Sequence, residues 1–196
     1  MAADLALLNA AQSPDARGPT VRVYRWDRPA VSIGRLQEEQ SVLRLHPGLP
    51  CVRRPTGGRA VLHGDDLTLS VVTRLDWLPQ DAGTVLASSQ RVLRGVLLAL
   101  QCCGQEAAFG SESSRTNRGA VDCFDLSAPC DLVNARTGRK LAGSAQRRES
   151  GVLLQQMSLA DGSIPDRHAF VAALRRTMCG ALDVIAWTSF DAVVAA

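Results

Sequence analysis

The sequence predicts an α+β fold, in which a mixed, largely antiparallel β-sheet packs with α-helices in a single domain. Short segments rich in Val, Ile and Leu, separated by Pro and Gly, lie within residues 21–74. A long segment with helical periodicity follows at 84–103, and a second group of strand-like segments precedes another helical segment at 166–182. Strands, a helix, more strands and a helix in this order are typical of α+β domains.

The first group of segments predicts five strands. Their sequences are VRVYRW (21–26), AVSIGR (30–35), PCVRR (50–54), AVLH (60–63) and LTLSVVTR (67–74). In the last of them Leu67, Leu69 and Val71 alternate with Thr68 and Ser70, which indicates a strand with one buried face.

The remaining elements follow in order along the chain. Residues 84–103 predict a helix that Gly104 ends, and the polar residues 110–119 predict a loop. Three strands are expected in 131–135, 139–148 and 151–160, with Ser150-Gly151 as a hairpin turn between the last two. Phe170, Leu174 and Met178 share one face of the helix expected at 166–182.

Composition excludes several classes of protein. The chain has 196 residues, 46% of them hydrophobic, which is typical of a globular domain with a substantial core. A net charge of +3 and an aromatic content of 4% are too low for a dense nucleic-acid-binding surface, so we expect no nucleic-acid partner. No apolar segment is long enough to span a bilayer, and the first residues do not resemble a secretory signal. We therefore expect a cytoplasmic protein without a membrane partner.

The six cysteines do not indicate a metal site. None forms a C-x-x-C pair and no His stands at ligand spacing, so we expect no bound metal. Most are expected to be reduced, buried thiols. Cys123 differs, because it follows the predicted polar loop, where a thiol is better placed to react.

A pair of glycines between two predicted strands is the first candidate binding feature. Gly57-Gly58 would let a ligand approach the backbone, although such a pair is also common in a plain turn. The segment matches neither a P-loop nor a dinucleotide fingerprint. Arg53 and Arg54 should point to opposite faces of their strand, so at most one of them faces a pocket. His63 alone suits a structural role as well as a catalytic one.

Lys140 is the only lysine in a chain that has 21 arginines. Chance explains one lysine in an arginine-rich chain, but a compact ammonium can also serve where the planar guanidinium cannot. A thiol with an ordinary pKa of about 8.5 is mostly protonated at neutral pH, and a neighbouring cation lowers that pKa. Lys140 is the candidate cation for Cys123.

Four segments in order resemble one known family. They are RRPTGGRAVLH followed by LTLSVV, then CFDLSAPCDLV, GRKLAGSAQRR and GVLLQQMSL, and MAADLALL resembles the family's first helix. Together they are similar to the biotin/lipoate protein ligase and acyltransferase family, and most to the octanoyl-[acyl carrier protein]:protein N-octanoyltransferases. The resemblance implies a class II biotin/lipoyl ligase-like fold over residues 1–196, shortened at both ends relative to the family.

The resemblance also implies roles for individual residues. Cys123 corresponds to the nucleophile that takes an octanoyl group from acyl carrier protein, and Lys140 to the lysine that lowers the pKa of that thiol. The acceptor would be a lysine of a lipoyl domain or of a glycine-cleavage H protein, and no cofactor would be required. The implied acyl-binding residues are Arg54, Thr56, Gly57, Gly58, Ala60, Val61 and His63, with Gly143 and Ser144 beside Lys140.

Three alternatives stay open at this point. An ATP-dependent lipoate or biotin protein ligase, which would use ATP and Mg, shares the fold and the lysine, although Arg59 stands where ligases have a third Gly. An octanoyl amidotransferase acting between lipoyl proteins would share the nucleophile. A paralogue that only binds acyl groups would agree with Gln155-Gln156-Met157-Ser158, where the family often has Gln-His-Gly-Ser.

Overall fold

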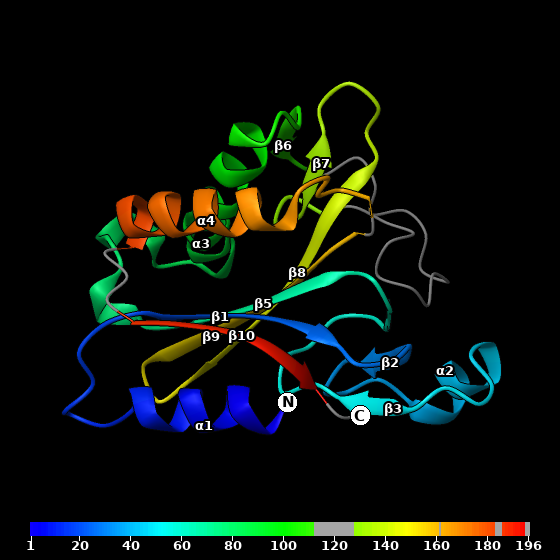
Figure 1. Cartoon of the computed structure of the whole chain (residues 1–196). Helices are drawn as coiled ribbons and strands as arrows, with labels where there is room; N and C mark the ends of the chain where they lie inside the picture. The colour runs from blue at the N-terminus through cyan, green and yellow to red at the C-terminus, as the bar shows by residue number, and fades with distance from the viewer. Residues whose placement is uncertain (112–127, 161, 183–185, 195–196) are drawn as a thin grey trace.

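Figure 1 shows the computed structural model of the chain, in which a large sheet lies between helices and a smaller sheet stands at one end. The structure describes residues 1–111, 128–160, 162–182 and 186–194, the last of these ranges by its backbone only. The helices are α1 (Ala2–Ala11), α2 (Glu39–Leu45), α3 (Val85–Cys102) and α4 (Arg167–Leu182), with short 3-10 helices η1 (Leu75–Trp77) and η2 (Gln80–Ala82). The strands are β1 (Thr20–Trp26), β2 (Ala30–Ile33), β3 (Cys51–Arg53), β4 (Val61–His63), β5 (Leu67–Arg74), β6 (Ala107–Phe109), β7 (Leu132–Asn134), β8 (Lys140–Glu149), β9 (Val152–Leu159) and β10 (Ala186–Val194).

The predicted mixed, largely antiparallel sheet is confirmed. The large sheet has the strand order β10-β1-β5-β9-β8-β7-β6, and the small sheet has the order β3-β2-β4. Pairing is antiparallel except between β1 and β10 and between β2 and β3. Ser150 and Gly151 both have positive φ, 48° and 75°, as the predicted tight hairpin between β8 and β9 requires.

Three elements were not expected from the residue patterns. Helix α2 and strand β6 are short, and neither has a clear periodicity. Strand β10 pairs in parallel with β1 and forms one edge of the large sheet. The expected loop at 110–119 lies almost entirely outside the described residues.

One face of the large sheet, here called the helix face, packs against α3 and α4 (Figure 1). Alternate residues of its strands enter this core, as side chains of period two require. Met157 of β9 belongs to it and is 2% exposed. Its main members are Val21, Val23, Leu69, Val71, Leu153, Leu159, Val92, Val96, Leu100, Phe170, Leu174 and Met178.

The opposite face, here called the pocket face, changes character along its length. Toward one end Leu8 of α1 packs on Val72, Val152 and Leu154. Beyond α1 the same face carries polar residues, because Thr68 pairs with Ser158 and Ser70 pairs with Gln156 across β5 and β9. The small sheet covers this polar end. No helix within the described residues is long and apolar enough to cross a membrane.

Candidate active site

A cavity lies between the polar end of the pocket face and the small sheet, and it is called the sheet pocket here. It encloses about 400 Å³ of empty space, including its open mouth. The large sheet contributes Tyr24, Thr68, Gly143, Ser144, Ala145, Gln156, Met157 and Ser158, the small sheet and its loop contribute Ser32, Arg54, Gly58, Val61 and His63, and Met1 completes the wall.

The loop that contains Gly57 and Gly58, called the glycine loop here, is held in place by the buried Arg54. Its guanidinium donates to the carbonyl oxygens of Gly57 at 3.0 Å and Arg59 at 2.7 Å. Gly58 has a φ of 87°, which other residues adopt only with strain. A Cβ on Gly34 would lie 2.0 Å from the Gly58 carbonyl oxygen, so only glycine permits this close approach.

The two neighbouring arginines separate as their strand register predicts. Arg53 is exposed and donates to the carbonyl oxygens of Gly34, Arg35 and Gln37. Arg54 faces the sheet pocket. The structure therefore confirms that the two point to opposite sides and identifies Arg54 as the one at the cavity.

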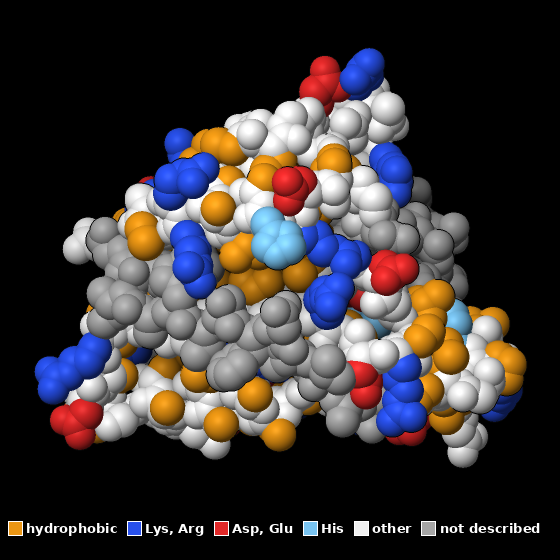
Figure 2. Space-filling model, in the orientation of Figure 1, with side chains coloured by type: hydrophobic (Ala, Val, Ile, Leu, Met, Phe, Trp, Pro, Cys, Tyr) orange, Lys and Arg blue, Asp and Glu red, His pale blue; other side chains and the backbone are white. Residues whose placement is uncertain are grey.

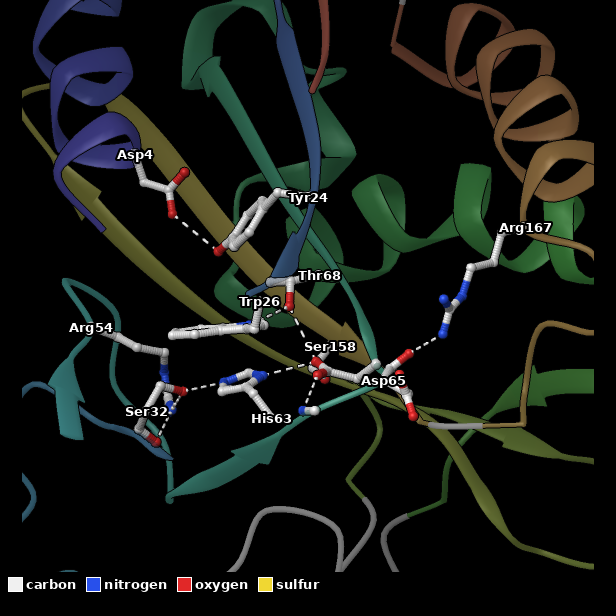
Figure 3. Close-up of polar contacts among 12 residues, drawn as sticks. Asp4, Tyr24, Trp26, Ser32, Arg54, His63, Asp65, Thr68, Ser158 and Arg167 are labelled. Carbon is white, nitrogen blue, oxygen red and sulfur yellow. Dashed lines mark hydrogen bonds and ion pairs between the residues drawn. The ribbon is translucent and has the colours of Figure 1, made fainter. Parts of the chain in front are cut away.

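A chain of hydrogen bonds runs through His63 (Figure 3). Nδ1 of His63 lies 2.8 Å from Asp66 Oδ2, and Nε2 lies 2.6 Å from Ser32 Oγ. Because an ionised carboxylate only accepts, Nδ1 of His63 donates to Asp66. Arg54 Nη1 donates to Ser32 Oγ at 2.8 Å, which extends the chain to the arginine.

Asp66 anchors the other end of this chain. Burial alone would raise the pKa of Asp66, but the hydrogen bond and charge of His63, with further bonds from Ser158 and the Gly64 amide, together hold that pKa below its ordinary value. Thr68 also donates to Asp66, and the Trp26 ring stacks on His63 with centroids 4.1 Å apart. Both nitrogens of His63 are thus engaged, as in a structural histidine.

A second polar group connects α1 to the pocket. Gln156 donates to Asp4 at 2.7 Å and accepts from Thr56 Oγ1 at 2.7 Å. Asp4 also pairs with Arg22 at 2.9 Å. Gln156 therefore faces the pocket in a fixed orientation. Met157 also lines the pocket and belongs to the core on the helix face.

Lys140 reaches the pocket face because β8 contains a bulge. Val133 pairs with Lys140 while Leu132 pairs with Ala142, so one additional residue, Leu141, stands in β8. Leu141 and Ala142 consequently both enter the core on the helix face. The extra residue turns Lys140 to the face on which His63 lies.

The Lys140 ammonium is buried beside a carboxylate. Its Nζ lies 2.9 Å from Asp131 Oδ2, and the side chains are 6% and 5% exposed. Asp131 also accepts from the Ala128 amide at 2.7 Å and the Ser144 amide at 3.2 Å. Such a pair positions the lysine, and loss of either partner would leave a buried charge.

Lys140 borders a second cavity, the Lys140 cavity, which shares His63 with the sheet pocket. Its described wall consists of Pro29, Leu62, His63, Gly64, Asp65, Asp66, Arg139, Lys140 and Ala160. The two cavities thus meet at His63, and Lys140 lines the second of them. Cys123, its expected partner, lies outside the described residues, so the Cys123–Lys140 pair stays a prediction.

The other predicted binding residues divide into two groups. Arg54, Gly58, Val61, His63, Gly143 and Ser144 line the sheet pocket. Thr56, Gly57 and Ala60 stand behind its wall: Thr56 holds Gln156, the Gly57 carbonyl accepts from Arg54, and Ala60 packs with Val31, Ile33 and Val42.

Several residues of the site were not predicted from the sequence. The fold alone places Asp131 beside Lys140, Ser32 beside His63 and Gln156 beside Thr56. The sequence gives a weak indication of Asp66, since a carboxylate three residues after a histidine on a turn is well placed to accept a hydrogen bond from it.

The comparison with known families covers most of the chain. Residues 1–178 match the family described as lipoyl protein ligase A/B catalytic domain. A protein of Carboxydothermus hydrogenoformans named octanoyltransferase LipM is 40% identical over 159 residues, covering 79% of this chain and 57% of that protein. Octanoyltransferase LipM of Geobacillus kaustophilus is 39% identical over 170 residues, covering 81% of this chain and 59% of that protein. The chain thus spans less than two thirds of the length of these relatives.

Solved structures share the fold. The bipartite lipoate protein ligase of Thermoplasma acidophilum superposes with a TM-score of 0.66 at 19% identity, covering 98% of this chain and 80% of that one. A lipoate-protein ligase A bound with ATP superposes with a TM-score of 0.67 at 19% identity, covering 98% and 82%. The class II biotin/lipoyl ligase-like fold is thereby confirmed.

Proposed function

Because this chain belongs to the lipoyl protein ligase A/B catalytic domain family, we propose that it carries an octanoyltransferase activity of lipoate biosynthesis. The octanoyl group would pass from acyl carrier protein to Cys123, and then to a lysine of a lipoyl domain or of a glycine-cleavage H protein. The proposal rests chiefly on relatives about 40% identical that are named octanoyltransferase. A cytoplasmic setting agrees with it, since the thiol must stay reduced.

The sheet pocket suits an acyl chain. Its polar side chains are bonded to one another, as in the Ser32–His63–Asp66 chain and the Thr56–Gln156–Asp4 chain. A ligand therefore meets few unsatisfied polar groups and gains mainly by burying apolar surface. Gly58 and Gly143 leave the wall open to close approach.

The first step would transfer the acyl group between two sulfurs. The Cys123 thiolate attacks the thioester carbonyl, a new C–S bond forms, and the carrier thiolate leaves and takes up a proton. This exchange is close to neutral in energy and needs no nucleotide. We propose that the Lys140 ammonium favours the thiolate and stabilises the oxyanion that forms on the carbonyl.

The second step would form an amide. The neutral amine of the acceptor lysine attacks the octanoyl-Cys123 carbonyl, the C–S bond breaks, and the proton of the amine passes to the cysteine sulfur. Asp131 would act as a positioning residue in both steps, because it holds the Lys140 ammonium at 2.9 Å. Lys140 would then stay oriented throughout.

Intact-mass measurement tests this proposal. Incubation with octanoyl-acyl carrier protein in the absence of ATP should add one octanoyl group to the chain. Cys123→Ala should abolish the adduct, and the matched variant Cys130→Ala should retain it. An octanoyl adduct on the Cys123→Ala protein would refute Cys123 as the nucleophile.

Two further substrates separate the alternatives. Pyrophosphate release from ATP in the presence of free octanoate or lipoate would favour a ligase, whose fold the ATP-bound structure shares. Octanoylated lipoyl-domain protein as the sole donor would reveal an amidotransferase. Absence of an adduct with every donor would favour a binding protein.

A further inference from the structure

A groove lies between β1 and α4, on the helix side of the large sheet, and is called the α4 groove here. Figure 2 shows a hollow in this region with hydrophobic side chains at its floor and basic side chains beside it. Its described lining consists of Val23, Tyr24, Leu67, Val171 and Ala172, with Arg25, Arg167, His168, Arg175 and Arg176.

The charged side chains described in this groove are all basic. Four arginines and a histidine line it, and no acidic side chain is among its described lining residues. The chain as a whole has a net charge of only +3, so this density is local. Arg25, Arg175 and Arg176 are exposed. A basic rim around an apolar floor matches an acidic amphipathic surface, since guanidinium groups pair well with carboxylates.

The groove leads toward Lys140. Arg167, at the start of α4, donates to the backbone carbonyl of Asp65 (Figure 3). Asp65 in turn lines the Lys140 cavity, together with Arg139 and Lys140. A partner seated in the α4 groove would therefore stand next to the mouth through which an acyl thioester could reach Lys140.

We propose that the α4 groove docks the acyl donor, a carrier protein that presents an acidic helical face. This inference rests on the proposed octanoyl transfer and adds the surface that recognises its donor. The donor fits better than the acceptor for an electrostatic reason. The arm of an acyl carrier is joined through an anionic phosphodiester, whereas the acceptor brings a lysine ammonium that an arginine-lined approach repels.

Charge reversal in the groove tests the proposal. Arg25→Glu/Arg176→Glu removes two exposed positive charges and adds two negative ones, without touching a residue placed in the transfer machinery. The matched control is Arg17→Glu/Arg44→Glu, which makes the same charge change at exposed positions outside the groove. Each protein is given two donors, octanoyl-acyl carrier protein and the octanoyl thioester of N-acetylcysteamine, which has no protein part.

The groove variant should lose only recognition of the protein donor. We expect its second-order rate of acyl-enzyme formation from the carrier to fall about tenfold or more, since rim charges govern association. Its rate with the small thioester should stay within about twofold. The control should behave like the unaltered chain with both donors, and added salt should slow the unaltered chain more than the groove variant.

Direct binding distinguishes a failure of docking from a failure of the proposed transfer. The dissociation constant for the carrier protein, measured without any acyl transfer, should rise about tenfold in the groove variant only. A chain that binds the carrier in this way but never forms an acyl-enzyme would retain the docking surface and lose the proposed function. Equal loss with both donors, equal loss in the control, or a defect confined to transfer onto the lipoyl domain would each overturn the docking proposal.

Discussion

The two faces of the large sheet use the same strands for different purposes. On the helix face, Val, Leu and Met side chains meet α3 and α4 in an apolar core, which Gln155 interrupts with hydrogen bonds to Ser144 and Gln146. On the pocket face, apolar contact ends with α1. The strands continue there with the buried Thr68, Gln156 and Ser158, which are hydrogen-bonded to Asp66, Asp4 and Thr56. An apolar core tolerates the exchange of one apolar side chain for another of similar volume. A buried polar side chain costs free energy unless it keeps its hydrogen-bond partner.

This contrast indicates where function and stability separate. Substitutions on the helix face should lower the free energy of unfolding and leave the chemistry of the folded protein intact. Substitutions at the polar end of the pocket face should impair the chemistry out of proportion to stability. The following experiments test this separation.

Lys140→Met should have the largest effect. It removes the proposed cation and leaves Asp131 buried without its partner, so we expect acyl-enzyme formation to fall by about a thousandfold and unfolding free energy to fall by about 3–5 kcal/mol. Intact-mass kinetics and denaturant unfolding measure the two. The double variant Lys140→Met/Asp131→Leu should recover much of the stability and none of the activity. Parental rates in Lys140→Met would contradict the role of this lysine.

Leu174→Ala should be the largest purely structural change. Leu174 is fully buried in the helix-face core, and its truncation should cost about 3 kcal/mol of unfolding free energy. Acyl-enzyme formation well below the unfolding midpoint should match that of the parent. Leu98→Ala, at a residue 38% exposed on the same layer of helices, is the control and should cost less than about 1 kcal/mol. A specific activity loss in folded Leu174→Ala would show that the two faces are coupled.

Gly34→Ala should displace the glycine loop. The new Cβ would lie 2.0 Å from the Gly58 carbonyl oxygen, so backbone must move, at a cost of about 1–3 kcal/mol. Acyl-enzyme formation should slow because Gly58 lines the sheet pocket. Gly57→Ala, whose Cβ would meet nothing within 4 Å, is the matched control. Comparable damage from both variants would mean that the loop tolerates no side chain at all, whatever its contacts.

Asp66→Asn should lower the unfolding free energy at neutral pH by about 0.5–1.5 kcal/mol, because its bonds to His63, Thr68 and Ser158 are weakened and not lost. Its pH dependence is more specific. Because the pKa of Asp66 is lowered in the folded chain, its contribution is present above the unfolded pKa of about 3.9 and is lost as pH falls through the folded value. Unfolding free energy of the variant should therefore fall less below pH 4 than that of the parent. If the unfolding free energies of the variant and the parent fell equally below pH 4, Asp66 would not contribute to stability in this way.

Local patterns in the sequence predicted most of the fold. The helical spacing in 84–103 predicts a buried helix face that the structure confirms. The alternation in Leu67–Arg74 correctly predicts a strand, but not its burial, because the strand is buried on both faces. Strand β6 has three residues and α2 has seven, which is too short for a periodic pattern to stand out. The parallel pairing of β10 with β1 joins residues far apart in the chain, and nothing local to either strand specifies it.

The site was predictable only where its residue types are unusual. A single lysine and a glycine pair attract notice in any reading, and the structure places both beside a cavity. The residues that surround the site have no unusual type or spacing in the sequence. Gln156, for example, bonds to Thr56 and Asp4, which lie 100 and 152 residues away in the chain. Ser32, likewise, is an ordinary strand serine until β2 pairs with β4 and sets it against His63.

The bulge in β8 carries a consequence for how insertions and deletions are tolerated. Lys140 and Gly143 point to the same side only because Leu141 breaks the odd-even rhythm of the strand between them. Deleting that one leucine would let Lys140 pair with Val133 in a regular ladder, and the two steps left to Gly143 would keep the ammonium on the same side. A ladder made regular with Leu141 still in place would instead turn Lys140 toward the apolar layer beneath α3 and α4. Lys140 and Gly143 can therefore share a side in two ways, three residues apart with the bulge or two residues apart without it.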